Sequence, residues 1–235
     1  MNGSARTDVT ITTATEATED DTYSIWALKT LYFILTKYGW WACIIIGIPG
    51  NTISIMITSK KSNRHISSCN YMTALAVVDT MTLLMISWAI ALMKWGFAAS
   101  LPEPTREILY KWMWYSVYLF AILSGLFLAE MSLDRLIAVR FPMVAVGYCT
   151  TSRAWKTIIF TGITIALVNA NLFYTYRYHK EDVLGTDILR ADVPESPFLE
   201  GLALGFQLGF GTLIPFVIIV ISNLWIIITV HKANK

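Results

Sequence analysis

The sequence predicts an all-α protein, a polytopic bundle of transmembrane helices. Hydrophobic residues make up 55% of the 235 residues and charged residues only 14%, whereas a soluble domain is about a quarter charged. Five apolar stretches are each long enough to cross a hydrocarbon core, which takes about 20 helical residues. The formal net charge of +2 gives no sign of nucleic-acid binding. Composition therefore argues against a soluble enzyme, a nucleic-acid-binding protein and a disordered chain.

The chain divides into an N-terminal tail and a transmembrane domain. Residues 1–30 are predicted to be a disordered extracellular tail, because they begin with a polar, acid-rich segment that cannot build a core. Asn2 begins a sequon that can be glycosylated if this end is outside the cell. Residues 31–235 form the transmembrane domain, with helices expected near 32–58, 71–93, 112–139, 155–176 and 198–230.

The loops between these helices indicate the orientation of the chain. On one side, nine Lys or Arg occur in 40 residues, in segments 59–70, 134–156 and 231–235. On the other side, nine occur in 79 residues, in segments 1–37, 94–111 and 177–200. Because basic residues concentrate in cytoplasmic loops, the first side is predicted to be cytoplasmic and the N-terminus extracellular.

Polar residues inside the apolar stretches are the candidates for function. Asp79 lies in the second stretch, where a carboxylate costs several kcal/mol unless it is protonated, paired or ion-bound. Asn51 lies at a similar depth in the first stretch, and its amide could donate a hydrogen bond to that carboxylate. The two residues predict either an ion or proton site or a polar clamp that only fixes helix packing.

The third and fifth stretches carry further candidates. Asp134 and Arg135 end the third stretch, and their opposite charges could pair and leave the guanidinium able to exchange partners. Arg135 could equally anchor the helix at the level of the lipid phosphates. Pro215 lacks an amide hydrogen and should kink or loosen the fifth helix. The basic turn that contains Lys60 and Lys61 is interpreted as a signal that sets the membrane orientation, rather than as a site of lipid recognition.

Aromatic residues gather at the outer end of the third stretch: Tyr110, Trp112, Trp114, Tyr115 and Tyr118. They are equally consistent with an interfacial belt and with a ligand pocket. The three cysteines lack the spacing of metal ligands, so no metal site is predicted.

Taken together, these features resemble the rhodopsin-like (class A) G-protein-coupled receptors. The similarity covers about residues 30–235 and rests on four motifs in order: Gly50-Asn51, Leu75-Ala76-Val77-Val78-Asp79, the run from Ser132 through Asp134-Arg135-Leu136 to Pro142, and Pro215. The resemblance implies a seven-helix receptor in the plasma membrane, and only five of the seven helices fall within these residues. The chain ends at Lys235, before helices six and seven, so a fragment or a truncated form is expected.

The resemblance also implies roles for particular residues. Asp79 and Asn51 would form an allosteric sodium and water site, so a sodium ion is the one cofactor that the chain could bind. Arg135, held by Asp134 at rest, would engage a heterotrimeric G protein. Pro142 would shape the second intracellular loop, and Pro215 would permit the fifth helix to rearrange.

The sequence departs from the family pattern at several positions. Tyr110 replaces the usual Cys at the outer end of helix three, and segment 177–200 has no Cys, so the usual disulfide is missing. Leu136 replaces the Tyr of the Asp-Arg-Tyr motif, and Asn223 stands where a Tyr is common. Trp155 lies near the start of helix four, so the usual central Trp is not evident.

The ligand is expected to be a peptide, in the manner of a neuropeptide receptor. Val117 stands where amine receptors carry an Asp, which disfavours an amine ligand, and the acidic segment 177–200 suits a basic peptide. The candidate pocket residues are Trp114, Val117, Tyr118 and Gln207. Membrane lipids are further expected partners, and the chain could form receptor oligomers.

Two alternative interpretations remain open from the sequence. The chain could be a truncated receptor that no longer signals and associates with other receptors. It could also be a small transporter or channel that uses Asp79 and Glu130 as a proton or cation path. An enzyme is not expected, because no nucleophile, base and oxyanion donors occur together.

Overall fold

The computed structural model describes residues 26–31, 34, 38–94, 101–175, 181–183, 186–188, 201 and 205–233. The chain forms two units, residues 1–46 and 47–235. In the first unit, residues 26–31 are helical and helix α2 (Trp40–Thr58) begins. The rest of α2 belongs to the second unit, which contains every site described below.

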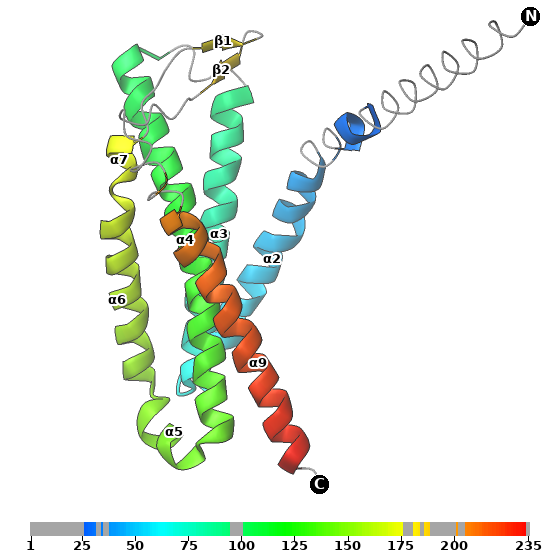
Figure 1. Cartoon of the computed structure of the whole chain (residues 1–235), viewed down its shortest axis with the longest axis vertical. Coiled ribbons are helices and arrows are strands. Elements are labelled where there is room, and N and C mark those ends of the chain that lie inside the picture. The colour runs from blue at the N-terminus through cyan, green and yellow to red at the C-terminus, as the bar shows by residue number, and fades with distance from the viewer. Residues whose placement is uncertain are drawn as a thin grey trace, which may run out of the picture. The chain divides into compact units, whose positions relative to one another are not determined.

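Four helices are long and apolar enough to cross a membrane. They are α2, α3 (Ser67–Lys94), α4 (Glu103–Arg140), and the helical segment from Gly205 that passes through η3 (Gly209–Leu213) into α9 (Ile214–Ala233). α4 is central in this unit and packs against both α3 and α9 (Figure 1). These helices confirm the predicted fold class, a helical membrane bundle.

Helix α6 (Thr151–Asn169) occupies the place of the fourth expected helix and lies along α3 and α4 (Figure 1). Its first two turns carry Arg153 and Lys156, which lower its mean hydropathy and keep it outside the group of four. The predicted helix, 155–176, begins and ends later in the chain than α6. α6 ends at Asn169, a turn follows, and the short helix α7 (Leu172–Thr175) comes after that turn.

Prolines explain both ends of α4, which is longer than the predicted 112–139. Pro104 lies in its first turn, where the missing amide hydrogen is not needed, so the helix begins at Glu103. Pro142 follows its last residue, Arg140, by two positions and starts α5 (Pro142–Tyr148). Phe141 before that proline has an extended φ of −129°, as the proline ring requires of the residue before it.

The two ends of the second unit differ in character. One end carries α5 and the turn 59–66 between α2 and α3, and is called the α5 end. The other carries a small hairpin, β1 (Glu181–Val183) antiparallel to β2 (Thr186–Ile188), and is called the hairpin end (Figure 1). This hairpin lies within the acidic segment 177–200 and was not predicted from the sequence.

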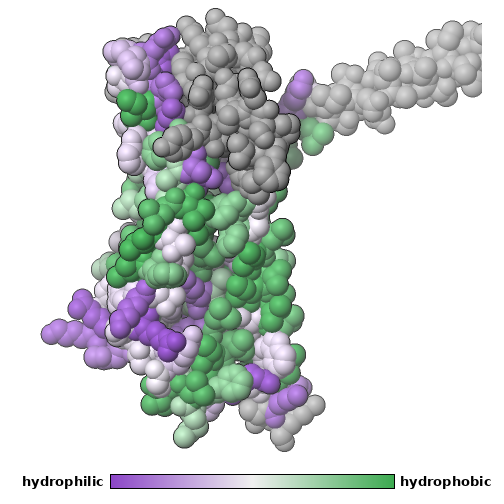
Figure 2. Space-filling view, turned by 60° about the vertical axis from the view of Figure 1, so that its left-hand side comes forward, coloured by the Kyte–Doolittle hydropathy of each residue, from purple (hydrophilic) through white to green (hydrophobic). Residues whose placement is uncertain are grey.

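The buried core lies between α3, α4 and α6. Its members are Tyr71, Ala74, Val78, Ile122, Leu123, Phe127, Met131, Ala154, Ile158 and Ile165. The outer faces of α6 and α9 instead expose large apolar side chains, such as Phe160 and Phe216. Figure 2 shows hydrophobic side chains across the middle of one face and hydrophilic ones toward the α5 end. An apolar outer surface of this kind suits contact with lipid.

Candidate functional site

Asp79 of α3 and Ser124 of α4 form a polar pair between two membrane helices. The Ser124 hydroxyl donates a hydrogen bond of 2.5 Å to the Oδ1 atom of Asp79, and both side chains are half-buried. The described hydrogen bonds of Asp79 do not include one from Asn51, so the role of Asn51 stays a prediction. Similar depth in two helices does not specify how the helices are rotated, and Asp79 meets α4 rather than α2. The available signal for Ser124 was a hydroxyl residue in the middle of an apolar helix.

This pair offers oxygen ligands to a hard cation. A carboxylate and a hydroxyl are donors that such ions accept, and their surroundings are apolar. In the part of the chain that the structure describes, no group of three or more His, Cys, Asp or Glu residues could hold a metal ion. A site at Asp79 would therefore depend on hydroxyl, amide or backbone oxygens for its remaining ligands.

Glu130 of α4 faces α6. Thr161 donates a hydrogen bond of 2.5 Å to its Oε1 atom, whereas its buried Oε2 atom has no hydrogen-bond partner. Thr161 therefore fastens α6 to α4 inside the apolar core, where such hydrogen bonds hold helices together.

Asp134 and Arg135 point to different surroundings at the α5 end. Asp134 is 7% exposed, and its Oδ2 atom accepts hydrogen bonds of 2.7 Å from the hydroxyls of Ser67 and Ser68. Arg135 is exposed, and its Nη2 atom lies 3.7 Å from the sulfur of Met72. The predicted ion pair between them is therefore absent. Adjacent residues on a helix point about 100° apart, so they do not face each other.

Cys149 connects the end of α5 to α4. Its thiol lies 3.6 Å from the Asp134 carbonyl oxygen, to which it donates. Burial raises the pKa of Cys149 to about 11, and the nearby Asp134 carboxylate adds to the shift. The thiol is therefore protonated at neutral pH and serves this contact rather than nucleophilic chemistry.

Helix α5 presents apolar side chains to its surroundings. Pro142 starts the helix, and Met143 and Val146 are 88% and 83% exposed, which is more than any other large hydrophobic residue that the structure describes. Neither residue was predicted from the sequence as a site residue. The available signal was a run of apolar residues between two polar segments, directly after the Arg135 motif. The α5 end thus carries an exposed cation and an exposed apolar patch.

Pro215 marks a close approach of α9 to α4. Pro215 is buried, and the preceding turn η3 has π-helical hydrogen bonding, with the Ile214 amide donating to the Gly209 carbonyl. A β-carbon placed on Gly125 of α4 would lie 3.6 Å from the Pro215 ring and 3.3 Å from the Gly211 carbonyl oxygen. The fifth helix was predicted to kink or loosen at Pro215. In the structure, the turn before Pro215, η3, is widened, and it lies beside Gly125 of α4.

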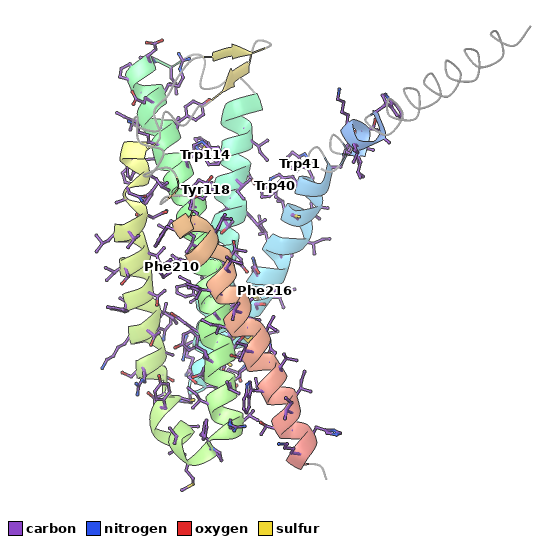
Figure 3. The ribbon with its side chains drawn as sticks, viewed as in Figure 1. Trp40, Trp41, Trp114, Tyr118, Phe210 and Phe216 are labelled. Carbon is purple, nitrogen blue, oxygen red and sulfur yellow. The ribbon has the colours of Figure 1, made fainter. Side chains whose placement is uncertain are left out.

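The aromatic residues at the outer end of α4 separate into two groups. Trp114 and Tyr118 are stacked with 5.7 Å between ring centroids and lie on the side of α3 (Figure 3). Trp112 and Tyr115 instead pack on Phe173, each with 5.0 Å between centroids. These residues therefore do not form a single belt.

The remaining predicted residues are dispersed or undescribed. Tyr110, at the position of the usual Cys, is buried against Met113 and Ala89. Val117 and Gln207 are half-buried. Asn2 lies outside the described residues, as does most of segment 177–200.

Comparisons with known proteins identify similar sequences. The family described as "7 transmembrane receptor (rhodopsin family)" matches residues 50–235. Thyrotropin-releasing hormone receptors match 49% of this chain over 124 residues, with 28% identity for Gallus gallus and 29% for Homo sapiens. Cysteinyl leukotriene receptor 1 of Mus musculus is 23% identical over 99% of this chain. The matches span 28% of the former receptors and 62% of the latter.

Proposed function

Because the chain belongs to the rhodopsin family of seven-transmembrane receptors, we propose that it transmits the binding of an extracellular ligand to a heterotrimeric G protein. The observation that carries this proposal is the family match over residues 50–235, which includes all four motifs of the predicted resemblance. The family and the receptor relatives are signalling proteins without enzymatic activity. The match also favours a receptor over the transporter or channel interpretation.

The α5 end is the proposed coupling face. Its basic loops favour a cytoplasmic location, with the N-terminus outside and the chain in the plasma membrane. Arg135 offers an exposed guanidinium, and Met143 and Val146 offer apolar contacts at the same end. Arginine and buried apolar side chains together dominate the binding energy of many protein interfaces. This combination supports docking of a G-protein surface.

The proposed switch works through the contact between α4 and α9. The close approach of Gly125 to Pro215 permits α9 to pack in two arrangements, because the widened turn η3 leaves its hydrogen bonding adaptable. A ligand at the hairpin end that binds one arrangement more tightly shifts the population toward it. Arg135 is free to change partners in that shift, since Asp134 is held by Ser67 and Ser68 instead.

The proposed ligand is a basic peptide that binds among the aromatic residues of α4. Trp114 and Tyr118 form its floor, with Val117 and Gln207 as further contacts. The acidic segment 177–200 favours a cationic ligand. The relatives point to different ligands by name, thyrotropin-releasing hormone and cysteinyl leukotriene. The first of these names supports a hormone-like peptide.

We also propose that Asp79 and Ser124 bind a sodium ion. The carboxylate supplies the negative charge and the hydroxyl supplies a neutral oxygen, which together suit a monovalent hard cation. The bound ion would offset the cost of a charged carboxylate inside the membrane. Asn51 is the third proposed member, and it would contribute after a rotation of α2.

Activation of G proteins by the full chain tests the proposed function. Cell membranes that contain the chain are mixed with purified heterotrimeric G protein, and nucleotide exchange is measured with thyrotropin-releasing hormone, a cysteinyl leukotriene or no ligand. Exchange above that of membranes without the chain is expected, and Arg135→Ala should lower it at least about tenfold. The matched control is Lys232→Ala, which removes another exposed cation of the same end. Equal exchange by wild type and Arg135→Ala would refute the role of Arg135, and no exchange under any condition would refute G-protein coupling.

A further inference from the structure

The side chains of Arg140 and Trp225 join α4 to α9 at the α5 end, and the proposed function does not use this contact. Arg140 is the last residue of α4, and its guanidinium carbon lies 4.3 Å from the centroid of the Trp225 ring in α9. The same carbon lies 5.6 Å from the centroid of the Phe141 ring, which comes next in the chain. The cation therefore lies within the range of cation–π attraction of both rings.

The charge of Arg140 is available for this contact. Arg140 is exposed, and in the described segments of the α5 end the only carboxylate side chain is that of Asp134. Ser67 and Ser68 already donate hydrogen bonds to that carboxylate, which is buried. The C-terminal end of a helix carries partial negative charge, which stabilises a cation in its last turn. The end of α4 and the two aromatic rings therefore act together to position Arg140.

A second contact between the same two helices lies nearer the hairpin end. There, Gly125 of α4 lies close to the Gly211 carbonyl oxygen and the Pro215 ring. Trp225 follows Pro215 by ten residues, so the two contacts are about 15 Å apart along α9. Between them, Ser222 of α9 is only 1% exposed. α9 thus remains packed from one contact to the other, and it crosses α4 at an angle (Figure 1).

The two contacts differ in how easily they can change. The contact at Gly125 involves backbone atoms and a proline ring, so it fixes the distance between the helices at that point. The Arg140–Trp225 contact instead joins the ends of two side chains, and Trp225 is 43% exposed. If α9 tilts about the fixed point, its displacement grows with distance from that point. Tilting therefore breaks the Arg140–Trp225 contact while the contact at Gly125 persists.

We propose that the Arg140–Trp225 contact stabilises one of two arrangements of α9 and has to break before the other can form. This inference rests on the proposed switch and deepens it, because it names the side chains that hold α9 at the α5 end. A ligand that favours the other arrangement has to offset the free energy of this contact. Release of Arg140 also changes the surroundings of Phe141, which leads into α5.

The distance between the α5 ends of α4 and α9 tests this proposal without a ligand or a G protein. In the full chain with its three cysteines replaced by serine, spin labels are attached to Val139→Cys and Ile228→Cys, since both residues are exposed. Double electron–electron resonance in detergent should show a shorter-distance and a longer-distance population. Arg140→Gln, and separately Trp225→Leu, should raise the ratio of longer to shorter about two- to fivefold, as expected for loss of an exposed cation–π contact.

Further variants separate this contact from general effects of charge and packing. Arg140→Lys keeps a cation and should keep most of the shorter-distance population. Lys232→Gln removes another exposed cation of α9 and should leave the ratio unchanged. Arg140→Gln combined with Trp225→Leu should change the ratio no more than one single variant, because the contact can be lost only once. Thermal unfolding of each labelled variant controls for folding.

Four outcomes would overturn the proposal. A single distance in every variant would mean that α9 has no second arrangement. An unchanged ratio in both single variants would mean that the contact does not stabilise either arrangement, and shifts that add in the double variant would mean that the two residues act separately. An equal shift in Lys232→Gln would attribute the ratio to net charge. The distances do not depend on G-protein activation, so a failure of the proposed function would be seen separately, in the nucleotide-exchange experiment.

Discussion

At the scale of single residues, serine hydroxyls stabilise the two aspartates of α3 and α4. Ser124 donates to Asp79, and Ser67 and Ser68 donate to Asp134. A hydrogen bond to a charged group contributes about 1.5–3 kcal/mol. This is a substantial fraction of the cost of placing a carboxylate in or beside the membrane. Among the described residues, Arg135 has no acidic partner, and it is available for another contact.

Removal of either member of the Asp79 pair should abolish or weaken the stabilisation of the chain by sodium. Wild type is expected to unfold at a higher temperature in sodium chloride than in choline chloride of equal ionic strength, because sodium binds only the folded site. Asp79→Asn should remove this difference, and Ser124→Ala should reduce it. The matched control is Ser132→Ala, since that hydroxyl bonds only its own helix. An undiminished sodium effect in Asp79→Asn would remove the ion from this site.

At the scale of the elements, the contact between α4 and the η3–α9 segment depends on small residues. Because Gly125 has no side chain, the Gly211 carbonyl and the Pro215 ring can lie close to it. Gly211 likewise lies close to Ile122 of α4, and a β-carbon placed on Gly211 would lie 3.2 Å from the Ile122 side chain. Small residues let membrane helices approach each other closely. Because Pro215 has no amide hydrogen, the turn before it can widen without losing a further donor.

Gly125→Ala should destabilise the bundle by about 1–3 kcal/mol, the usual cost of overpacking a close contact. The added methyl group would lie 3.3 Å from the Gly211 carbonyl oxygen, so the η3–α9 segment must shift by a few tenths of an ångström. Thermal unfolding in detergent measures the effect. Gly162→Ala in α6 is the control, since a β-carbon there meets no atom within 4 Å. Stability of Gly125→Ala equal to that of Gly162→Ala would contradict the importance of the contact.

At the scale of the whole molecule, the difference between the two ends suggests how the chain sits in the membrane. The α5 end carries the basic turn 59–66, Arg135 and the apolar residues of α5, whereas the hairpin end carries the aromatic groups of α4. The distribution of basic residues supports a cytoplasmic α5 end. In this orientation, the proposed ligand-binding and G-protein-binding sites lie at opposite ends of α4.

Glycosylation of Asn2 tests this orientation directly. The chain expressed in mammalian cells should lose mass on treatment with an N-glycosidase, because an extracellular sequon meets the glycosylation machinery. Asn2→Gln should abolish the change in mass, and Ser4→Thr should keep it, since threonine also completes a sequon. A glycosidase-sensitive mass that persists in Asn2→Gln, or its absence from the wild-type chain, would contradict an extracellular N-terminus.

The sequence by itself determined that the protein is a helical membrane protein and a receptor of the rhodopsin family. Long apolar stretches must form helices in lipid, because only a helix satisfies its own backbone hydrogen bonds there. The four motifs could be identified because each is a short run of residues at one place in the chain. The positions of Pro104 and Pro142 also indicate where α4 begins and ends, although the apolar pattern alone predicted a shorter helix.

Only the tertiary structure decided which side chains meet. Asp79 bonds Ser124 rather than Asn51, Asp134 bonds Ser67 and Ser68 rather than Arg135, and the aromatic residues of α4 face two directions. The physical reason is that an apolar sequence determines that a helix forms, whereas its rotation about its own axis depends on packing against its neighbours. A rotation of half a turn exchanges one set of partners for another without changing the helix itself.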